Sequence, residues 1–429
     1  MKPCGLDNQS YCRLTEDAPV GFLTEAEKKV PVSHVCDVAV AGSGVSGLFA
    51  ALAAARAGAR TVLIERLGSL GGNIGPGMIL GGGWLPEVMM PKGASGIPAE
   101  FLKRVEELRC RDINYPEESG IVSYLGLKMC REAGVETILS AYVSDPVMED
   151  STVRGIFVEG KSGRTAVKAG VVIDATGDAS IAQRAGAPMI VHVPPKEEYS
   201  LLISEDILDK DYEWWNEAGV EYIVGGLETG NGVSWFREVL KGQFDTNSTM
   251  QISEIEKILR TRAFELVMKK KAEEEGWKDA NLLAVADYIG ARGGPCIEGE
   301  HVLTIEEAWR GDRFADVIYK VIFRRPNAKE GFNKDGFEVP YSIMLPRMID
   351  GMLVIGRGAS YIRRGHDGTG TRVRLSMMSM GEAAGHAASI ASIEGISPRE
   401  IDIRKLQRYM HSSGYFLGDA GRIHELGLN

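Results

Sequence analysis

Residues 35–72 read VCDVAVAGSGVSGLFAALAAARAGARTVLIERLGSLGG. A run of small and β-branched residues comes first, an alanine-rich segment follows, and the apolar run TVLIE closes the unit. Small and β-branched residues favour a buried strand, whereas alanine favours a helix. The stretch therefore predicts a strand, a helix and a second strand parallel to the first, which is the βαβ unit that opens a parallel sheet.

Three glycines stand where the first predicted strand meets the helix. Gly42, Gly44 and Gly47 form the pattern GxGxxG, and Glu65 ends the second strand. In such a turn the first glycine permits a sharp bend, the second lets a pyrophosphate approach the backbone, and the third lets helix and strand pack closely. The helix N-terminus offers N–H groups to the phosphates, and the acid accepts hydrogen bonds from the adenosine ribose. The pattern predicts an adenine dinucleotide without a 2′-phosphate and leaves FAD and NAD both open.

The composition limits the classes of protein to which the chain can belong. Its 49 basic and 59 acidic side chains give a net charge of −10, which argues against nucleic acid as a partner. With 44% hydrophobic and 25% charged residues, the 429 residues suit a soluble globular protein of roughly two or three domains. Six cysteines show no CxxC or Cys/His spacing, so we expect no metal site and reduced thiols in a cytoplasmic protein.

The N-terminal residues show no secretory signal, and one apolar stretch needs an interpretation. Residues 38–57 are rich in glycine in their first half and end at an arginine, so we interpret them as a strand and a helix and expect no membrane span.

Periodicity divides the chain into an extension, a discontinuous domain and an insertion. Residues 1–33 show no clear period and are expected to form an N-terminal extension on the surface. Residues 34–193 and 336–429 are predicted to form one Rossmann-like α/β domain, with a glycine-rich loop and a small antiparallel meander. Residues 194–335 are acidic and aromatic, with helical spacing over 251–276, and are predicted to form an inserted α+β substrate or cap domain.

Further motifs connect both ends of the chain to a known group of flavoproteins. They are the double glycine at 71–72, VVIDATGD over 171–178, GMLVIGR over 351–357 and MGEAAG over 380–385. With the βαβ stretch, they resemble the FAD site of the glutathione-reductase-type flavoproteins, and their order resembles the bacterial FAD-dependent oxidoreductase family. One position departs from that family, because Gly358 stands where its members usually have a cysteine. The departure leaves no thiol to expect beside the flavin.

The fingerprint and this resemblance together imply that FAD is the cofactor, with its ring between the glycine-rich loop and the last long helix. Glycines admit the ring without a Cβ clash, and a helix N-terminus near the pyrimidine end stabilises negative charge on reduced flavin. The implied cofactor contacts are Gly42, Ser43, Gly44, Val45, Ser46, Gly47, Glu65, Arg66, Gly71, Gly72, Asn73, Tyr142, Val143, Ala175, Thr176, Gly177, Gly356, Arg357, Gly381 and Glu382.

The loop before the last long helix holds the main candidates for catalysis. His366 titrates near neutral pH and is a candidate base for a substrate proton while hydride moves to flavin N5. Arg372 matches an arginine of the family, and Arg292 lies in the glycine-rich GARGGP, so both are candidate clamps for a carboxylate or phosphate. Without the resemblance, a backbone-bonded loop histidine and arginines in surface salt bridges would be the commoner interpretation.

The sequence as a whole favours an FAD-dependent oxidoreductase or dehydrogenase that exchanges hydride or electrons with a small organic molecule. The lack of a second GxGxxG after Gly186 disfavours a disulfide-reductase arrangement with its own NAD domain. Two alternatives stay open, an NAD-utilising enzyme resembling thiazole synthases and a non-catalytic dinucleotide-binding module. The intact fingerprint argues against the second of these. The substrate, the electron acceptor or donor, and homo-oligomer formation are not determined by the sequence.

Overall fold

The structure is a computed structural model, and it describes most of the chain. The described residues are 11–13, 19, 21–79, 93–108, 116–190, 216–228, 232–321, 336–361 and 373–428. Among the helices in these ranges, none combines the length and apolarity needed to cross a membrane.

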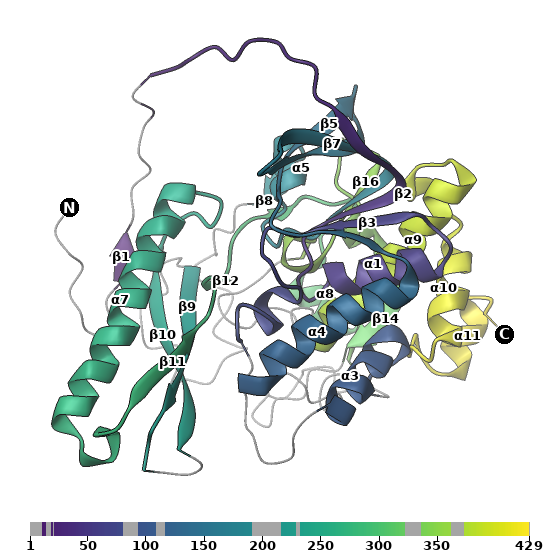
Figure 1. The fold of residues 1–429 in the computed structure, drawn as a ribbon. Coiled ribbons are helices and arrows are strands. Elements are labelled where there is room, and N and C mark those ends of the chain that lie inside the picture. The colour runs from purple at the N-terminus through teal and green to yellow at the C-terminus, as the bar shows by residue number, and fades with distance from the viewer. Residues whose placement is uncertain are drawn as a thin grey trace.

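A seven-stranded sheet forms the centre of the larger part of the molecule (Figure 1). Its strand order is β4-β3-β2-β7-β6-β5, and β16 pairs with the carboxyl end of β7. Strands β4, β3, β2, β7 and β16 are parallel, whereas β5, β6 and β7 form the antiparallel meander that the sequence predicted. The strands are β2 Val32–Ala41, β3 Thr61–Ile64, β4 Glu136–Ile138, β5 Tyr142–Glu149, β6 Thr152–Gly160, β7 Gly163–Asp174 and β16 Met352–Val354.

Both faces of this sheet are buried, as expected for parallel strands covered on two sides. In β2, Val38 and Val40 lie in the core shared with the helices, while Ala39 and Ala41 lie in the core shared with β6 and α5. The small and β-branched residues of the opening stretch therefore suit both faces. The helices are α1 Gly47–Arg56, α3 Gly96–Leu108, α4 Pro116–Ala133, α5 Ser180–Arg184, α9 Arg374–Glu394, α10 Ile403–Ser412 and α11 Ala420–Glu425.

Helices α1 and α9 approach each other closely because small residues line their contact. A Cβ at Gly381 would overlap the carbonyl oxygen of Ser46, and a Cβ at Gly385 would overlap that of Ala50. The first turn of α1 is thus fixed by a helix more than 300 residues later in the chain.

A second sheet lies beside the first and has a hydrophobic core of its own (Figure 1). Helix α7 (Thr249–Glu273) packs on it through residues such as Ile255 and Leu259, and it agrees with the helical spacing noted over 251–276. The α+β prediction for this region gave no positions for its strands, because Glu, Gly and Ala interrupt the alternation in β9. They are β1 Tyr11–Arg13, β9 Asn216–Gly225, β10 Val233–Gln243, β11 Asn281–Val285 and β12 Gly290–Arg292.

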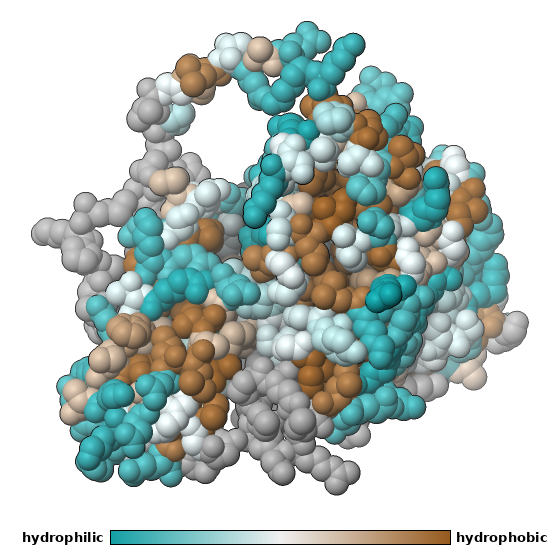
Figure 2. Space-filling model, in the orientation of Figure 1, coloured by the Kyte–Doolittle hydropathy of each residue, from teal (hydrophilic) through white to brown (hydrophobic). Residues whose placement is uncertain are grey.

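Part of the N-terminal extension belongs to this second sheet. Strand β1 pairs in parallel with β10, so residues 11–13 extend the sheet at one edge. Figure 2 shows apolar residues gathered on the visible face of this part of the molecule. Leu283 of β11 is 59% exposed.

The chain returns to the larger core after β12. Leu303, Val317 and Tyr319 pack in the same core as α1 and α9. The remaining elements are β8 Met189–Ile190, β13 Cys296–Ile297, α8 Ile305–Arg310, β14 Val317–Val321, β15 Phe337–Pro340, and the 3-10 helices Gly72–Ile74, Glu275–Trp277, Tyr341–Met344, Gly356–Gly358 and Pro398–Glu400.

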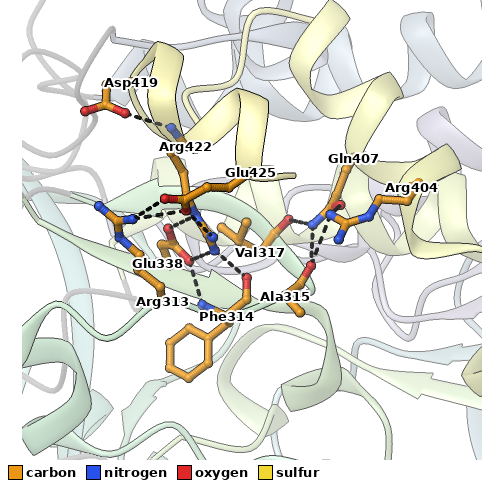
Figure 3. Close-up of polar contacts among 10 residues, drawn as sticks. All are labelled: Arg313, Phe314, Ala315, Val317, Glu338, Arg404, Gln407, Asp419, Arg422 and Glu425. Atoms are coloured by element: carbon orange, nitrogen blue, oxygen red, sulfur yellow. Dashed lines mark hydrogen bonds and ion pairs between the residues drawn. The ribbon is translucent and has the colours of Figure 1, made fainter. Parts of the chain in front are cut away.

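Two polar networks fasten the C-terminal helices to β14 and β15 (Figure 3). Arg422 of α11 donates from Nε and Nη2 to the two carboxylate oxygens of Glu338, each at 2.9 Å. Gln407 of α10 donates from Nε2 to the carbonyls of Ala315 at 2.9 Å and Val317 at 3.0 Å. A bidentate pair in a buried position fixes both direction and distance.

Candidate functional site

Four parallel strands end at one edge of the main sheet. Ala41 of β2 is in register with Ile64 of β3 and with Asp174 of β7, and Val354 of β16 is also in register with Asp174. The segments that follow these strands therefore emerge together. Ligands of open α/β sheets bind outside the carboxyl ends of the strands, so this edge is the candidate site.

The three fingerprint glycines each meet the requirement that their spacing predicted. Gly42 has a φ of +98°, and a Cβ there would lie 2.7 Å from the carbonyl oxygen of Ala175. A Cβ at Gly47 would overlap the Gly42 carbonyl, so helix and strand pack as closely as glycine allows. At Gly44, by contrast, a Cβ would meet no atom within 4 Å. The middle glycine thus borders open space. A pyrophosphate needs such space to approach the backbone.

The N-terminus of α1 has the features of an anion site. Its N-cap residue Ser46 makes no side-chain capping hydrogen bond, and the first turn holds no acidic residue. The first N–H groups of a helix have no partner within the helix, and the helix dipole places partial positive charge there. One of these groups, the Leu48 N–H, donates to the Gly44 carbonyl at 3.1 Å. The partial positive charge of the helix end still favours a phosphate beside Gly44.

Glu65 is buried at the end of β3 and held in one orientation. Its Oε2 accepts hydrogen bonds from the Ser43 N–H at 2.9 Å and the Ser43 hydroxyl at 2.6 Å, while Oε1 accepts from the Leu67 N–H at 2.9 Å. A carboxylate has about four lone-pair sites, so Glu65 keeps acceptor capacity for ribose hydroxyls. Ser43 therefore orients Glu65 from within the fingerprint.

The start of β5, where Tyr142 and Val143 lie, is next to Glu65. The Ala141 N–H donates to the Glu65 carbonyl at 3.1 Å. The side chain of Tyr142 is 47% exposed at this position.

The glycine-rich loop folds back over the fingerprint. The Gly71 N–H donates to the Ser43 carbonyl at 3.0 Å, and a Cβ at Gly72 would lie 2.7 Å from the Cα of Gly44. The next residue, Asn73, accepts a hydrogen bond on Oδ1 from the hydroxyl of Tyr288 at 2.9 Å. The loop thus connects the fingerprint to the second sheet, and its residues 80–84 lie outside the described part of the chain.

The turn after β7 is shaped by a buried carboxylate. Asp174 accepts hydrogen bonds from the Thr176 hydroxyl at 2.7 Å and from the N–H groups of Thr176, Ile181 and Ala182. Burial raises the pKa of Asp174, and these donors act in the opposite direction. The network fixes Ala175, Thr176 and Gly177 against the fingerprint turn.

Arg357, implied as a flavin contact, is joined to the protein through all three guanidinium nitrogens. Nε donates to the Gly177 carbonyl at 2.9 Å, Nη2 to Asp178 Oδ1 at 2.6 Å, and Nη1 to the Ala291 carbonyl. Asp178 Oδ1 also accepts from the Thr246 hydroxyl at 2.7 Å. Since Ala291 lies in β12 and Thr246 precedes α7, Arg357 connects the carboxyl edge of the main sheet to the second sheet.

The last implied cofactor residues pack near α1. Gly356 has a φ of +70°, and a Cβ there would lie 2.6 Å from the Ser46 hydroxyl oxygen, so it reaches the start of α1. Glu382 is fully buried and accepts hydrogen bonds from the hydroxyls of Tyr409 and Tyr415, each at 2.8 Å, and from the Ile97 N–H at 2.7 Å. These contacts give Glu382 an anchoring role, and flavin contacts at Gly381 and Glu382 stay predictions.

The three catalytic candidates can be placed only in part. His366 and Arg372 lie outside the described residues. Arg292 lies in β12, where its Cα pairs with that of Glu217, and its side chain is not among those described. Within the described ranges, no group of three or more His, Cys, Asp or Glu residues has the arrangement of a metal site.

Sequence reasoning missed the contributions of Tyr288, Ala291 and Asp178 to this edge. Tyr288 and Ala291 come from the second sheet, and although Ala291 lies in the GARGGP segment noted for Arg292, nothing in that segment indicated a contact with Arg357. Asp178 ends the quoted ATGD motif, so its position was known but its ion pair with Arg357 was not.

Two cavities differ in their relation to the site. One of about 450 Å³ lies between α4 and the second sheet and is lined by Met78, Ser119, Gly120, Ile223, Val233, Leu283 and Ala284. Met78 continues the glycine-rich loop, so this cavity adjoins the site. The other, of about 410 Å³, includes Val35 and Cys36 at the amino end of β2, which is the wrong edge for a ligand of a parallel sheet.

Comparison with known proteins places the chain in a family. The model of the family described as FAD dependent oxidoreductase matches residues 37–202 and 206–410. The chain belongs to this FAD dependent oxidoreductase family. The matched ranges include the fingerprint, the ATGD turn and the whole of α9.

Individual curated relatives match a much shorter part of this chain than the family model does. Residues of this chain are 30% identical over 154 positions to a thiamine thiazole synthase of Methanococcus maripaludis, covering 34% of this chain and 57% of that protein. A thiamine thiazole synthase of Saccharolobus islandicus is 30% identical over 151 positions, covering 33% and 54%. The chain thus spans about half the length of the curated relatives it matches.

The solved structures that match this chain have low sequence identity and TM-scores below 0.5. A geranylgeranyl bacteriochlorophyll reductase-like protein of Thermoplasma acidophilum is 13% identical with a TM-score of 0.40, covering 92% of this chain and 96% of that one. A p-nitrophenol 4-monooxygenase of Pseudomonas putida is 14% identical with a TM-score of 0.42, covering 92% of both chains.

The carboxyl edge meets the physical requirements of the cofactor in the family's description. Gly44 borders open space at an uncapped helix N-terminus, and Glu65 offers acceptor capacity nearby. These are the groups that a pyrophosphate and an adenosine ribose need. The residues present therefore fit FAD.

Proposed function

We propose that this chain is an FAD-dependent oxidoreductase of the glutathione-reductase-type superfamily, which moves hydride or electrons between a small organic substrate and flavin N5. The observation that carries the proposal is the open space at Gly44, beside the N-terminus of α1 and a pre-oriented Glu65. When bound, FAD supplies the hydride and electron chemistry.

The roles of the chain's own residues follow from the geometry at this edge. The first N–H groups of α1 bind the pyrophosphate, and Glu65 accepts hydrogen bonds from the ribose. The backbone at Tyr142 and Val143 would face the adenine, because β5 starts next to Glu65. Gly356 lets the segment after β16 approach Ser46 at the start of α1, where the pyrophosphate is proposed to bind.

For the substrate, we propose the inserted region 194–335, and within it the second sheet, as the main contributor. The cavity between α4 and this sheet is lined by five apolar residues with only Ser119 and Gly120 beside them. A cavity of this size and lining suits a small, largely apolar molecule. The electron acceptor or donor of the enzyme is not identified, and a cytoplasmic location stays a prediction.

For catalysis, we propose His366 as the base that accepts the substrate proton, with Arg372 and Arg292 orienting an anionic group of the substrate. This assignment rests on the sequence. A histidine side chain can accept a proton near neutral pH, and a general base must do this. On an identified substrate, His366→Ala should lower kcat by about 100-fold or more. Unchanged turnover would remove His366 from the mechanism.

The absorption spectrum of the purified protein tests the function itself. A yellow protein that releases FAD on denaturation supports the proposal, and anaerobic reduction by candidate donors then identifies the substrate class. A colourless protein that takes up no added FAD overturns it.

A second candidate function is an NAD-utilising enzyme. It is favoured by the partial similarity to two thiamine thiazole synthases, which covers about a third of this chain. The same carboxyl edge would hold an adenine dinucleotide as a substrate. Release of an adenine dinucleotide other than FAD from colourless protein would support this candidate, and empty protein would favour a binding module.

A further inference from the structure

Tyr288 belongs to the second sheet, yet its side chain reaches the fingerprint of the main sheet. It lies between β11 and β12, in a segment held by three backbone hydrogen bonds. The N–H groups of Ala286, Asp287 and Ile289 donate to the Glu221 carbonyl, the Pro76 carbonyl and Glu256 Oε1, at 2.8, 2.9 and 2.9 Å. The segment is therefore rigid on both sides of Tyr288, and one of its anchors, Pro76, lies in the glycine-rich loop.

The hydroxyl of Tyr288 sits inside the curve of that loop. It donates to Asn73 Oδ1 at 2.9 Å. A Cβ added at Gly72 would lie 3.4 Å from this hydroxyl oxygen, and one added at Gly77 would lie 3.2 Å from it. Because the same Cβ at Gly72 would lie 2.7 Å from the Cα of Gly44, one residue separates the hydroxyl from the middle fingerprint glycine.

The ring of Tyr288 holds the residue that follows Glu65. The guanidinium carbon of Arg66 lies 4.9 Å from the ring centroid, within range of a cation–π contact. Arg66 is exposed, and the Tyr288 ring offers its guanidinium a contact on one side. A guanidinium stacked on a ring keeps its edge N–H groups free for a phosphate or a ribose oxygen.

The hydrogen bond also sets the orientation of Asn73. Burial raises the pKa of Tyr288, so its hydroxyl stays protonated and acts as a neutral donor. When the amide oxygen of Asn73 accepts this proton, its NH₂ group is turned to the other side. An NH₂ donor and an Arg cation are the groups that the oxygens of a dinucleotide accept.

From these contacts we infer that Tyr288 is a positioning residue of the FAD site, supplied by the second sheet, which orients Asn73 and Arg66 toward the cofactor. The inference rests on the proposed function, because it assumes that FAD binds at this edge. If Tyr288 has this role, the affinity for FAD depends on contact between the two sheets. The GxGxxG fingerprint by itself does not predict such a dependence.

Titration of cofactor-free protein with FAD, followed by the quenching of flavin fluorescence, tests the inference. Tyr288→Phe keeps the ring under Arg66 and removes only the hydrogen bond, so the Kd for FAD should rise about fivefold. Tyr288→Leu removes both contacts, and the Kd should rise about 20-fold or more. Tyr124→Phe, on the exposed side of α4, is the matched control and should leave the Kd unchanged.

A double-mutant cycle separates positioning from a general loss of structure. If Tyr288 acts through Asn73, Tyr288→Phe should change the Kd less than about twofold in an Asn73→Ala background. Thermal unfolding of the cofactor-free variants checks that each is folded. Equal FAD affinity in wild type, Tyr288→Phe and Tyr288→Leu would overturn this inference alone. Failure of the wild type to take up FAD would overturn the proposed function together with it.

Discussion

The carboxylate of Glu382 in α9 accepts a 2.8 Å hydrogen bond from the hydroxyl of Tyr415, and no part of Glu382 is exposed to solvent. Tyr409 and the Ile97 N–H donate to the same carboxylate. One side chain thus joins α9, the start of α3 and the C-terminal region. Glu382 belongs to the MGEAAG motif, which was expected to contact the flavin. In the structure its hydrogen bonds hold helices together.

Removal of this acceptor should destabilise the fold. Glu382→Ala removes the acceptor of two buried donors and of the partly buried Tyr409 hydroxyl, and we expect a loss of about 3 kcal/mol in the free energy of unfolding. Glu382→Gln keeps one amide oxygen, and the tyrosine hydroxyls can rotate to accept from the NH₂ group, so its loss should be smaller. Urea denaturation of the two variants measures the difference. Equal stability of Glu382→Ala and wild type would contradict the anchoring role.

The same residue should make stability depend on pH. Burial raises the pKa of Glu382 above its ordinary value, so the folded state holds the proton more tightly than the unfolded state. Stability from this group is present below the unfolded pKa, near 4.5, and is lost as pH rises through the folded pKa. Wild type should therefore lose Tm relative to Glu382→Gln as pH rises above about 4.5. Parallel pH profiles for the two proteins would rule this out.

His386 should act in the opposite direction. Its ring stacks on Tyr409 with centroids 3.6 Å apart, and burial lowers its pKa to about 4. The unfolded state therefore binds the proton more readily, and stability falls as pH drops from about 6.5 to about 4. His386→Phe keeps a flat ring and removes the titration, so its Tm should fall less over that window. Thermal unfolding of both proteins at a series of pH values makes the comparison.

Gly44→Val tests the pyrophosphate site directly. A Cβ at Gly44 meets no protein atom, so the variant should keep the Tm of cofactor-free wild type while failing to bind FAD. Gly160→Val, at another glycine with open space around it, is the control and should bind FAD normally. Isolation of Gly44→Val with one FAD per chain would show that the pyrophosphate lies elsewhere.

The contact between α1 and α9 should tolerate no added methyl group. A Cβ at Gly385 would overlap the Ala50 carbonyl, so Gly385→Ala should lower the free energy of unfolding by about 2 kcal/mol. Gly120→Ala is also within a helix but has open space, and it should stabilise by about 0.5–1 kcal/mol because alanine is the better helix former. Chemical denaturation distinguishes the two outcomes, and a neutral Gly385→Ala would mean that the helices can separate at no cost.

The parts of this protein that local sequence determined share one physical basis. The fingerprint glycines, the strand that ends at Glu65 and the meander after Tyr142 depend on residues close together in the chain. Backbone conformation, helix propensity and hydrophobic alternation act over that range. The family was indicated by the resemblance of the chain's motifs to those of known flavoproteins.

Tertiary structure alone decided which residues complete the site. Asn73 and Tyr288 are 215 residues apart, and Arg357 and Asp178 are 179 apart. Their contacts depend on the register of two sheets, and β9 gave no clear alternation from which its register could be predicted. Glu382 likewise gained its hydrogen-bond partners only when α3 and the C-terminal region packed around it. Sequence could place the glycines that open the dinucleotide site, whereas only packing could show what holds it in shape.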